Sequence, residues 1–247
     1  MTTTRSPDPP PLGRLLTRRE ALALIGVPGA ALLVRAVPAL AQAGGALPSC
    51  VARPQQTEGP FFVDEALNRS DIRSDPKSGA LRPGVPLRLG FRVSRLTGTT
   101  CTPLAGAQVD IWHSDAEGRY SDVGGFGLRS STGGQQFLRG YHLTDATGAA
   151  QFLTIHPGWY GGRAVHVHFK IRTEESAGRK YAFTSQLYFD DAFNARVFAA
   201  EPYASRGRRW PRNADDGIFR DGGAQLLLAP QPDGEGYAAR FDVALQV

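Results

Sequence analysis

The chain has 247 residues, of which 41% are apolar and 21% are charged, and its formal net charge is +5. This composition is typical of one large globular domain and argues against a disordered or membrane-embedded protein. Basic residues are scattered, and "RGRRWPR" at 206–212 is the only dense basic cluster, so the composition gives no support to a nucleic-acid-binding role.

The first 43 residues differ from the rest and predict a cleaved export signal. The arginine pair Arg18–Arg19 precedes a short apolar run and small residues, with cleavage expected after Ala41 or Ala43. Such a pair is typical of a twin-arginine signal, and the run is short for a membrane span. We expect a periplasmic or secreted protein without stable membrane association; an uncleaved anchor is the alternative. Removing five arginines and two acids with the signal lowers the net charge from +5 to +2.

Cys50 and Cys101 are the two cysteines of the chain. In an oxidising compartment an even number of cysteines favours a disulfide, and two cysteines allow one pairing. We therefore expect a Cys50–Cys101 disulfide that ties the amino-terminal arm to the sheet. Two buried free thiols are the alternative.

Beyond residue 50, the pattern predicts strands separated by turns. Short runs rich in β-branched and aromatic residues alternate with Gly, Pro, Asp and Asn. The predicted strands are 86–96, 107–115, 137–145, 149–158, 164–173, 182–190 and 237–247. Residues 44–247 are thus expected to form one all-β domain, a β-sandwich of mainly antiparallel strands. The stretches 116–136 and 191–222 are predicted to be long loops, the second with one or two short helices, and loops of this size on a sandwich commonly carry the functional site.

The segment "WYGGRAVHVHF", residues 159–169, holds two histidines on one predicted strand. Because side chains alternate along a strand, one set faces the core: Val165, Val167, Phe169 and Ile171. His166 and His168 then lie on the opposite face, roughly 7 Å apart at Cα, and can bind one metal ion. Considered alone, the H-x-H pattern favours two solvent-facing histidines.

Two tyrosines can complete a set of four ligands. Tyr160 lies six residues before His166, and Tyr120 follows the second predicted strand in "DAEGRYSD". A buried phenol ionises at neutral pH only when a strongly charged cation holds it, and hard anionic oxygen donors favour Fe(III) over Fe(II). The combination indicates a ferric site, whereas each tyrosine alone would be interpreted as an edge residue with its hydroxyl in water.

The sequence resembles the intradiol ring-cleavage dioxygenases, non-haem Fe(III) enzymes that open catechols between the two hydroxyl-bearing carbons on a β-sandwich. The resemblance runs from "TEGPFF" at 57–62, through "PLAGAQVDIWHSDAEGRYSD" and "FLRGYHLTDATGAAQFLTIHPGWYGGRAVHVHFKI", to "FTSQLYFDD" at 183–191. The Tyr-x-x-Arg-x-x-His-x-His spacing is its most specific part. No segment here is long enough for the helical amino-terminal domain of many cytoplasmic members.

The resemblance implies a role for each residue of this pattern. The iron ligands would be Tyr120, Tyr160, His166 and His168. Tyr160 would also act in catalysis as the ligand that catechol displaces, together with Arg163, which stabilises negative charge on the ring, and Gln186. The implied reaction uses O2 and a catechol-type substrate and gives a cis,cis-muconic acid derivative; the sequence does not select one catechol.

Several other polar residues match no functional position of the family. These are His113, His142, His156, Glu58, Arg73, Asp190 and Asp191, which we expect to be structural, surface or salt-bridge residues. Two alternatives to the dioxygenase remain open. One is a non-catalytic β-sandwich module that binds an aromatic compound or carbohydrate, and the other is an Fe(II) oxygenase built on two histidines and a carboxylate. A homodimer is compatible with the sequence.

Overall fold

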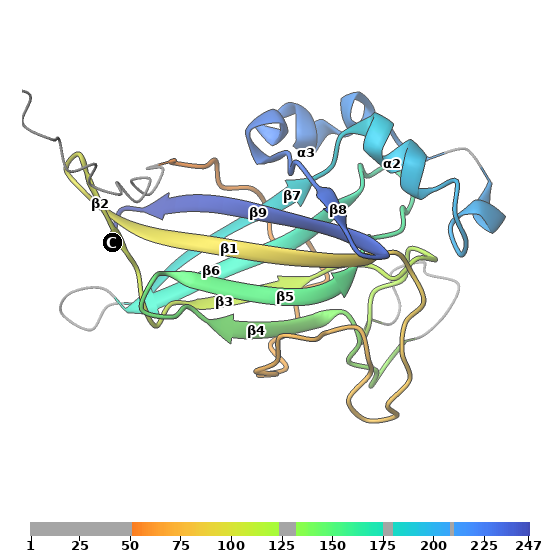
Figure 1. Cartoon of the computed structure of the whole chain (residues 1–247), viewed down its shortest axis with the longest axis horizontal. Coiled ribbons are helices and arrows are strands. Elements are labelled where there is room, and N and C mark those ends of the chain that lie inside the picture. The colour runs from red at the N-terminus through yellow and green to blue at the C-terminus, as the bar shows by residue number, and fades with distance from the viewer. Residues whose placement is uncertain (1–50, 124–131, 175–179, 208–209) are drawn as a thin grey trace, which may run out of the picture. The chain divides into compact units, whose positions relative to one another are not determined.

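The computed structural model describes residues 51–123, 132–174, 180–207 and 210–247. The strands of this part of the chain form two sheets (Figure 1). The first sheet has the order β4 (Arg139–Leu143), β3 (Gln108–Trp112), β6 (His166–Glu174) and β7 (Lys180–Tyr188). The second has the order β2 (Thr100–Pro103), β1 (Pro86–Thr97), β9 (Gly236–Leu245) and β8 (Gln231–Asp233), and β5 (Ala149–Ile155) also pairs with β1.

The predicted all-β sandwich is confirmed. Each of the seven predicted strands is present, and among the named strands β1 and β9 form the one parallel pair. Two short strands, β2 and β8, were not predicted. β8 is exposed throughout and β2 nearly so, so neither carries the apolar alternation by which a half-buried strand is recognised.

The core lies between the two sheets. The rings of Phe91 on β1 and Phe169 on β6 have centroids 5.4 Å apart, which places the sheets face to face (Figure 1). As predicted, Val165, Val167 and Ile171 are buried in the same cluster. Burial of each such side chain contributes about 1.5–3 kcal/mol, and this contribution fixes which face of β6 is left for the histidines.

Short helices follow β7 in the chain and lie near its end (Figure 1). They are α2 (Asp191–Val197) and α3 (Gly217–Arg220), with 3-10 turns at Ala204–Arg206, Asn213–Asp215 and Gly223–Leu226. Asp190 begins α2 as its N-cap, because its side chain accepts hydrogen bonds from the first-turn amides. No helix of the described ranges is both long and apolar enough to cross a membrane.

The surface polar residues of the amino-terminal arm are used in ion pairs, as expected. Arg73 lies 2.8 Å from Asp71, and Glu58 pairs with Lys170 of β6. The predicted export signal, including Arg18–Arg19, lies outside the described residues, as does Cys50. Cleavage after Ala41 or Ala43 and the Cys50–Cys101 disulfide therefore stay predictions.

Candidate metal centre

The candidate site lies at one end of the β4-β3-β6-β7 sheet, on the face away from the core. Strand register aligns four residues in a row across that sheet, since Arg139 pairs with Trp112, Trp112 with His168, and His168 with Gln186. Directly paired residues point to the same face of a sheet. His168 therefore lies at the centre of a row contributed by four strands.

Four potential metal-ligating atoms converge beside this row. His166 Nε2 lies 3.0 Å from His168 Nε2, 3.2 Å from the Tyr160 hydroxyl and 3.4 Å from the Tyr120 hydroxyl. Both imidazoles are 1% exposed, so the solvent-facing interpretation of the H-x-H pattern is wrong. The structure brings together all four side chains that the sequence predicts as ligands.

The tautomer of His166 suits metal binding. Its Nδ1 lies 2.6 Å from the Ala164 carbonyl oxygen, and a carbonyl only accepts, so Nδ1 carries the proton. Burial and the nearby Arg163 charge lower the pKa of His166 to about 3. The ring is then neutral, and Nε2 presents a lone pair toward the other three donor atoms.

The two tyrosines reach the site from two loops that touch through their backbones. A Cβ on Gly118, in the Tyr120 loop, would lie 2.2 Å from the Trp159 carbonyl oxygen. A Cβ on Gly158, just before Tyr160, would lie 2.3 Å from the Ala116 carbonyl oxygen. Only glycine permits such an approach, so these two residues allow the phenols to meet at the end of β6.

Tyr120 and Tyr160 differ in their surroundings. Tyr120 is 2% exposed, and its ring stacks on Phe61 with centroids 4.4 Å apart. Tyr160 is only half-buried. Burial, reinforced by the neighbouring Tyr160, raises the pKa of Tyr120 well above its usual range; burial also raises the pKa of Tyr160, although Arg163 opposes this. Both phenols are therefore neutral unless a cation lies between them.

Arg163 is held in place by two side chains. Its Nε donates to Asp216 at 3.0 Å, and one terminal nitrogen donates to Gln186 Oε1. Asp216 also accepts from the Ala164 amide at 3.0 Å. Burial alone would raise the pKa of Asp216, but the Arg163 charge and these hydrogen bonds lower it overall. A carboxylate thus fixes the guanidinium beside the four donor atoms.

Gln186 links the sheet to the "TEGPFF" arm. Its Nε2 donates to the Thr57 carbonyl oxygen at 2.9 Å, and its Oε1 accepts from the Tyr188 hydroxyl at 3.0 Å. A Cβ on Gly59 of the same arm would lie 3.4 Å from His168 Cε1. The arm therefore lies against the candidate site.

Sequence reasoning missed two residues that support this site. The Trp112 ring stacks on His168, with centroids 4.9 Å apart and planes 5° apart, and Asp216 holds Arg163 from 53 residues away. Trp112 stands in "QVDIWH", where the alternation assigns it to the face away from the core, but nothing local shows which strand lies next to it. Asp216 carries only the local signal of a helix N-cap, which it is for α3.

The other histidines contribute no atom to this cluster. His113 bonds Thr154 Oγ1 at 2.6 Å and the Ser114 carbonyl oxygen at 2.8 Å. His156 is surrounded by aromatic rings, and His142 is half-buried on β4. Within the described ranges, no three His, Cys, Asp or Glu side chains gather as metal ligands, so these residues do not form the two-histidine, one-carboxylate triad.

The donor set fits a ferric ion. The His168 imidazole nitrogen and the two phenol oxygens each lie within 3.4 Å of His166 Nε2. His168 Nδ1 is buried without a hydrogen-bond partner in the described structure, so the polar contact of this ring is made by Nε2, which lies 3.0 Å from His166 Nε2. Deprotonation of two buried phenols requires a strongly charged cation, and hard oxygen donors suit Fe(III).

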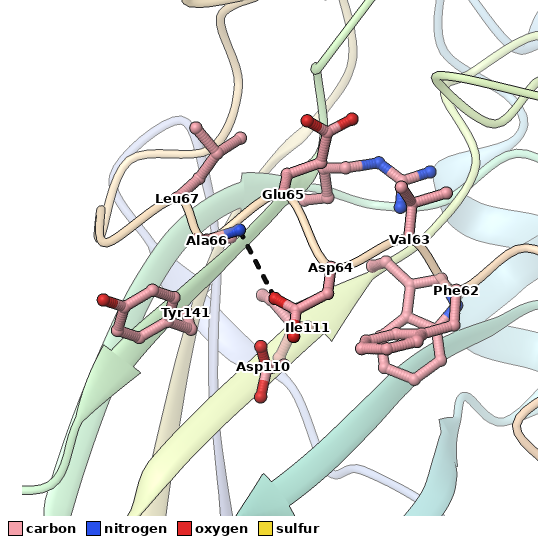
Figure 2. Close-up of a pocket in the computed structure, with 12 residues that line it drawn as sticks. Phe62, Val63, Asp64, Glu65, Ala66, Leu67, Asp110, Ile111 and Tyr141 are labelled. Carbon is pink, nitrogen blue, oxygen red and sulfur yellow. Dashed lines mark hydrogen bonds between the residues drawn. The ribbon is translucent and has the colours of Figure 1, made fainter.

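A small hollow lies outside this cluster of donor atoms and is too small for a substrate. Figure 2 shows the arm residues 62–67 lying over β3 and β4, with Asp64 accepting from the Ala66 amide at 3.4 Å. The hollow measures about 20 Å³, which is room for one water molecule. Of its three carboxylates, Asp64 and Asp110 pair with Arg172, and Glu65 accepts a hydrogen bond from the Gln136 side chain.

Comparisons with known proteins agree with this geometry. The family model described as "Dioxygenase" matches residues 57–203. Catechol 1,2-dioxygenase 1 of Acinetobacter lwoffii is 29% identical over 146 residues, which are 50% of this chain and 43% of that enzyme. The protocatechuate 3,4-dioxygenase beta chain of Burkholderia cepacia is 29% identical over 164 residues, 60% of this chain and 66% of that one. The chain thus spans 43% and 66% of the length of these two curated relatives.

Solved structures give the same result over more of the chain. An intradiol ring-cleavage dioxygenase from Tetranychus urticae is 28% identical with a TM-score of 0.69, covering 80% of this chain and 95% of that one. The dioxygenase domain of a carbohydrate-binding fusion from Streptomyces sp. SirexAA-E is 28% identical with a TM-score of 0.55, covering 80% and 99%. With the family model matching more than half of its residues, the chain belongs to the intradiol ring-cleavage dioxygenases.

Proposed function

We propose that this protein is an Fe(III)-dependent intradiol dioxygenase that cleaves a catechol-type aromatic with O2 and gives a cis,cis-muconic acid derivative. The observation that carries the proposal is the meeting of the Tyr120 and Tyr160 hydroxyls with His166 Nε2 and His168 Nε2. These four side chains would hold the iron. The chemistry that Fe(III) supplies when bound is chelation of both catechol oxygens, which gives the ring the electron density that O2 attacks.

The unequal burial of the two tyrosines supports different roles for them. Tyr120 is 2% exposed and stacked on Phe61, so it has little room to move and would remain a ligand. Tyr160 is half-buried and therefore less confined than Tyr120. As catechol arrives, Tyr160 would leave and take up a substrate proton at its hydroxyl oxygen, since its pKa without a metal is raised by burial.

Arg163 would stabilise the negative charge that develops on the ring. Its guanidinium cannot lose its proton near neutral pH, and Asp216 and Gln186 fix its position before substrate binds. A pre-oriented cation in a site from which water is excluded stabilises developing charge more strongly than a mobile one in water. Gln186 would act by orienting Arg163 and by holding the arm at Thr57.

Residues 1–43 support a proposal about where the protein acts. Their arginine pair and short apolar run support export of the folded protein to the periplasm or beyond. This route suits a protein that acquires its metal before export. The substrate would then be a catechol met outside the cytoplasm.

Oxygen uptake on a panel of catechols tests the proposal. The panel contains catechol, protocatechuate and hydroxyquinol, and mass spectrometry identifies the products. We expect one O2 consumed per substrate and a ring-opened diacid that contains both oxygen atoms. An iron-loaded, coloured protein that consumes no O2 with any of these would favour the non-catalytic binding module instead.

A further inference from the structure

A groove lies beside the candidate metal centre and shares Tyr160 with it. It is lined by Trp159, Tyr160, Gly161, Arg206, Trp210, Pro211 and Arg212, and its volume is about 620 Å³. Ligand-binding pockets typically measure about 300–1,000 Å³. The groove can therefore accept a group considerably larger than one catechol ring.

The groove adjoins the candidate metal centre at Tyr160. This residue lines the groove, while its hydroxyl lies 3.2 Å from His166 Nε2. A catechol chelated at the metal in place of Tyr160 would thus lie next to the groove. Any substituent on its ring has this space to enter.

Aromatic faces and guanidinium groups alternate along the groove. Arg206 lies over the Trp159 ring at 3.9 Å, and Arg212 lies over the Trp210 ring at 4.2 Å. The two indole rings have centroids 6.2 Å apart, and Trp210 is half-buried. Such surfaces stack on planar ligands, and a guanidinium held on an aromatic face is ready to pair with a carboxylate.

The charge of the groove favours an anion. Among its described lining residues, Arg206 and Arg212 are cationic and none is acidic. The carboxylates whose charges act on Arg206, those of Asp115 and Glu117, both pair with Arg119. Arg206 donates to the Ala116 and Trp159 carbonyl oxygens and so stays fixed, whereas Arg212 is exposed and accessible to a ligand.

We propose that this groove is a subsite for the substituent of a substituted catechol, and that the preferred substituent is a planar, unsaturated or aromatic group that ends in a carboxylate. Arg212 would pair with the carboxylate, and Trp210 would stack on the planar part. This inference rests on the proposed function, since it assumes that a catechol binds at the metal. It also assigns a role to Arg206, Trp210 and Arg212, which the metal centre does not use.

Substrate selectivity tests the subsite. We would compare kcat/KM for catechol, for 3,4-dihydroxycinnamate and for its methyl ester in the iron-loaded protein and in the variants Trp210→Ala and Arg212→Gln. We expect the wild type to prefer the dihydroxycinnamate, and each substitution to lower its ratio to catechol about tenfold. In Arg212→Gln the preference for the acid over its ester should disappear. Arg196→Gln removes an exposed arginine of α2 outside the groove and should leave both ratios unchanged.

A binding measurement separates the subsite from catalysis. Titration calorimetry with 3,4-dimethoxycinnamate uses a ligand whose blocked oxygens cannot chelate iron. We expect saturable binding that Arg212→Gln weakens about tenfold. If no catechol is turned over but this binding is observed, the proposed function fails and the subsite stands. If catechol is turned over while the selectivity ratios and this binding are the same in both variants and the wild type, the subsite is overturned and the proposed function stands.

Discussion

Two pairs of buried histidines lie in this molecule, and their surroundings differ. His166 and His168 belong to the candidate metal centre, while His113 and His156 lie in the interior. All four are 1% exposed. Burial lowers the pKa of His166 to about 3 and, with the charge that His113 would carry, lowers that of His156 to about 3 as well. Neither burial nor pKa therefore separates a ligand histidine from a structural one.

The difference lies in what faces the ring nitrogens. His166 Nε2 meets two phenol oxygens and a second imidazole. His156 meets rings instead, the nearest being Phe189 at 4.5 Å between centroids, and neither of its nitrogens has a hydrogen-bond partner in the described structure. Convergence of several ligand atoms on one point is what identifies a metal site.

The largest expected effect comes from removing a ligand of the first pair. His166→Ala should lower iron affinity by more than about 100-fold, because even partners that only orient a ligand account for 10–100-fold. Iron content after gel filtration measures this. His156→Leu, at the same level of burial, should keep its iron. Full iron occupancy in His166→Ala would contradict the assignment of the two pairs.

Removing the Arg163 guanidinium should lower turnover while leaving metal binding intact. Arg163→Ala should keep iron and lower kcat about 10²–10³-fold, the range seen when one preorganised charge-stabilising group is removed. Arg163→Lys should recover part of the rate, since it restores charge without the fork that bonds Asp216 and Gln186. Iron content and steady-state kinetics check this, and an unchanged kcat in Arg163→Ala would exclude its role.

Moving apart the two loops that carry Tyr120 and Tyr160 should weaken iron binding at His166 and His168. In Gly158→Ala, the new Cβ would meet the Ala116 carbonyl oxygen, so we expect about 1–3 kcal/mol lower stability from overpacking and weaker iron binding. Gly161→Ala is the matched control, since a Cβ there meets nothing within 4 Å. Denaturant unfolding and iron content measure both, and equal behaviour of the two variants would contradict the close contact of the loops.

The smallest expected effect is the pH dependence of folding stability that His156 causes. His156 has a pKa of about 3 in the folded protein and about 6.5 when unfolded, so below pH 6.5 the unfolded state binds more protons. Its stability contribution is complete above that pH and is lost as pH falls toward about 3. At pH 5 the loss is about 2 kcal/mol relative to pH 8.

The variant His156→Leu should remove this loss. Its stability should fall by about 2 kcal/mol less than that of the wild type between pH 8 and pH 5. At pH 8 it should be as stable or slightly more so, because two unpartnered buried nitrogens are removed. Denaturant unfolding at the two pH values measures both, and an equal loss in variant and wild type would show that His156 is protonated in the folded state.

Local pattern predicted much of the fold and part of the site. The alternation in "VHVHFKI" placed both histidines on one non-core face of β6 because side-chain direction depends on neighbouring residues alone. The alternation could not show that this face of β6 is buried, since the loops near residues 59, 120 and 160 bury it. Trp112 and Asp216 escaped prediction for the same reason: strand register and loop packing join residues far apart in the chain.

The absorption spectrum after ferric reconstitution tests the central claim most directly. If Tyr120 and Tyr160 ligate Fe(III) together with His166 and His168, the wild type should bind one iron per chain and turn burgundy through tyrosinate-to-iron charge transfer. Tyr120→Phe should shift or weaken that colour, and adding catechol to the wild type should change it as Tyr160 leaves. A colourless wild type after reconstitution would contradict the assignment of the metal centre.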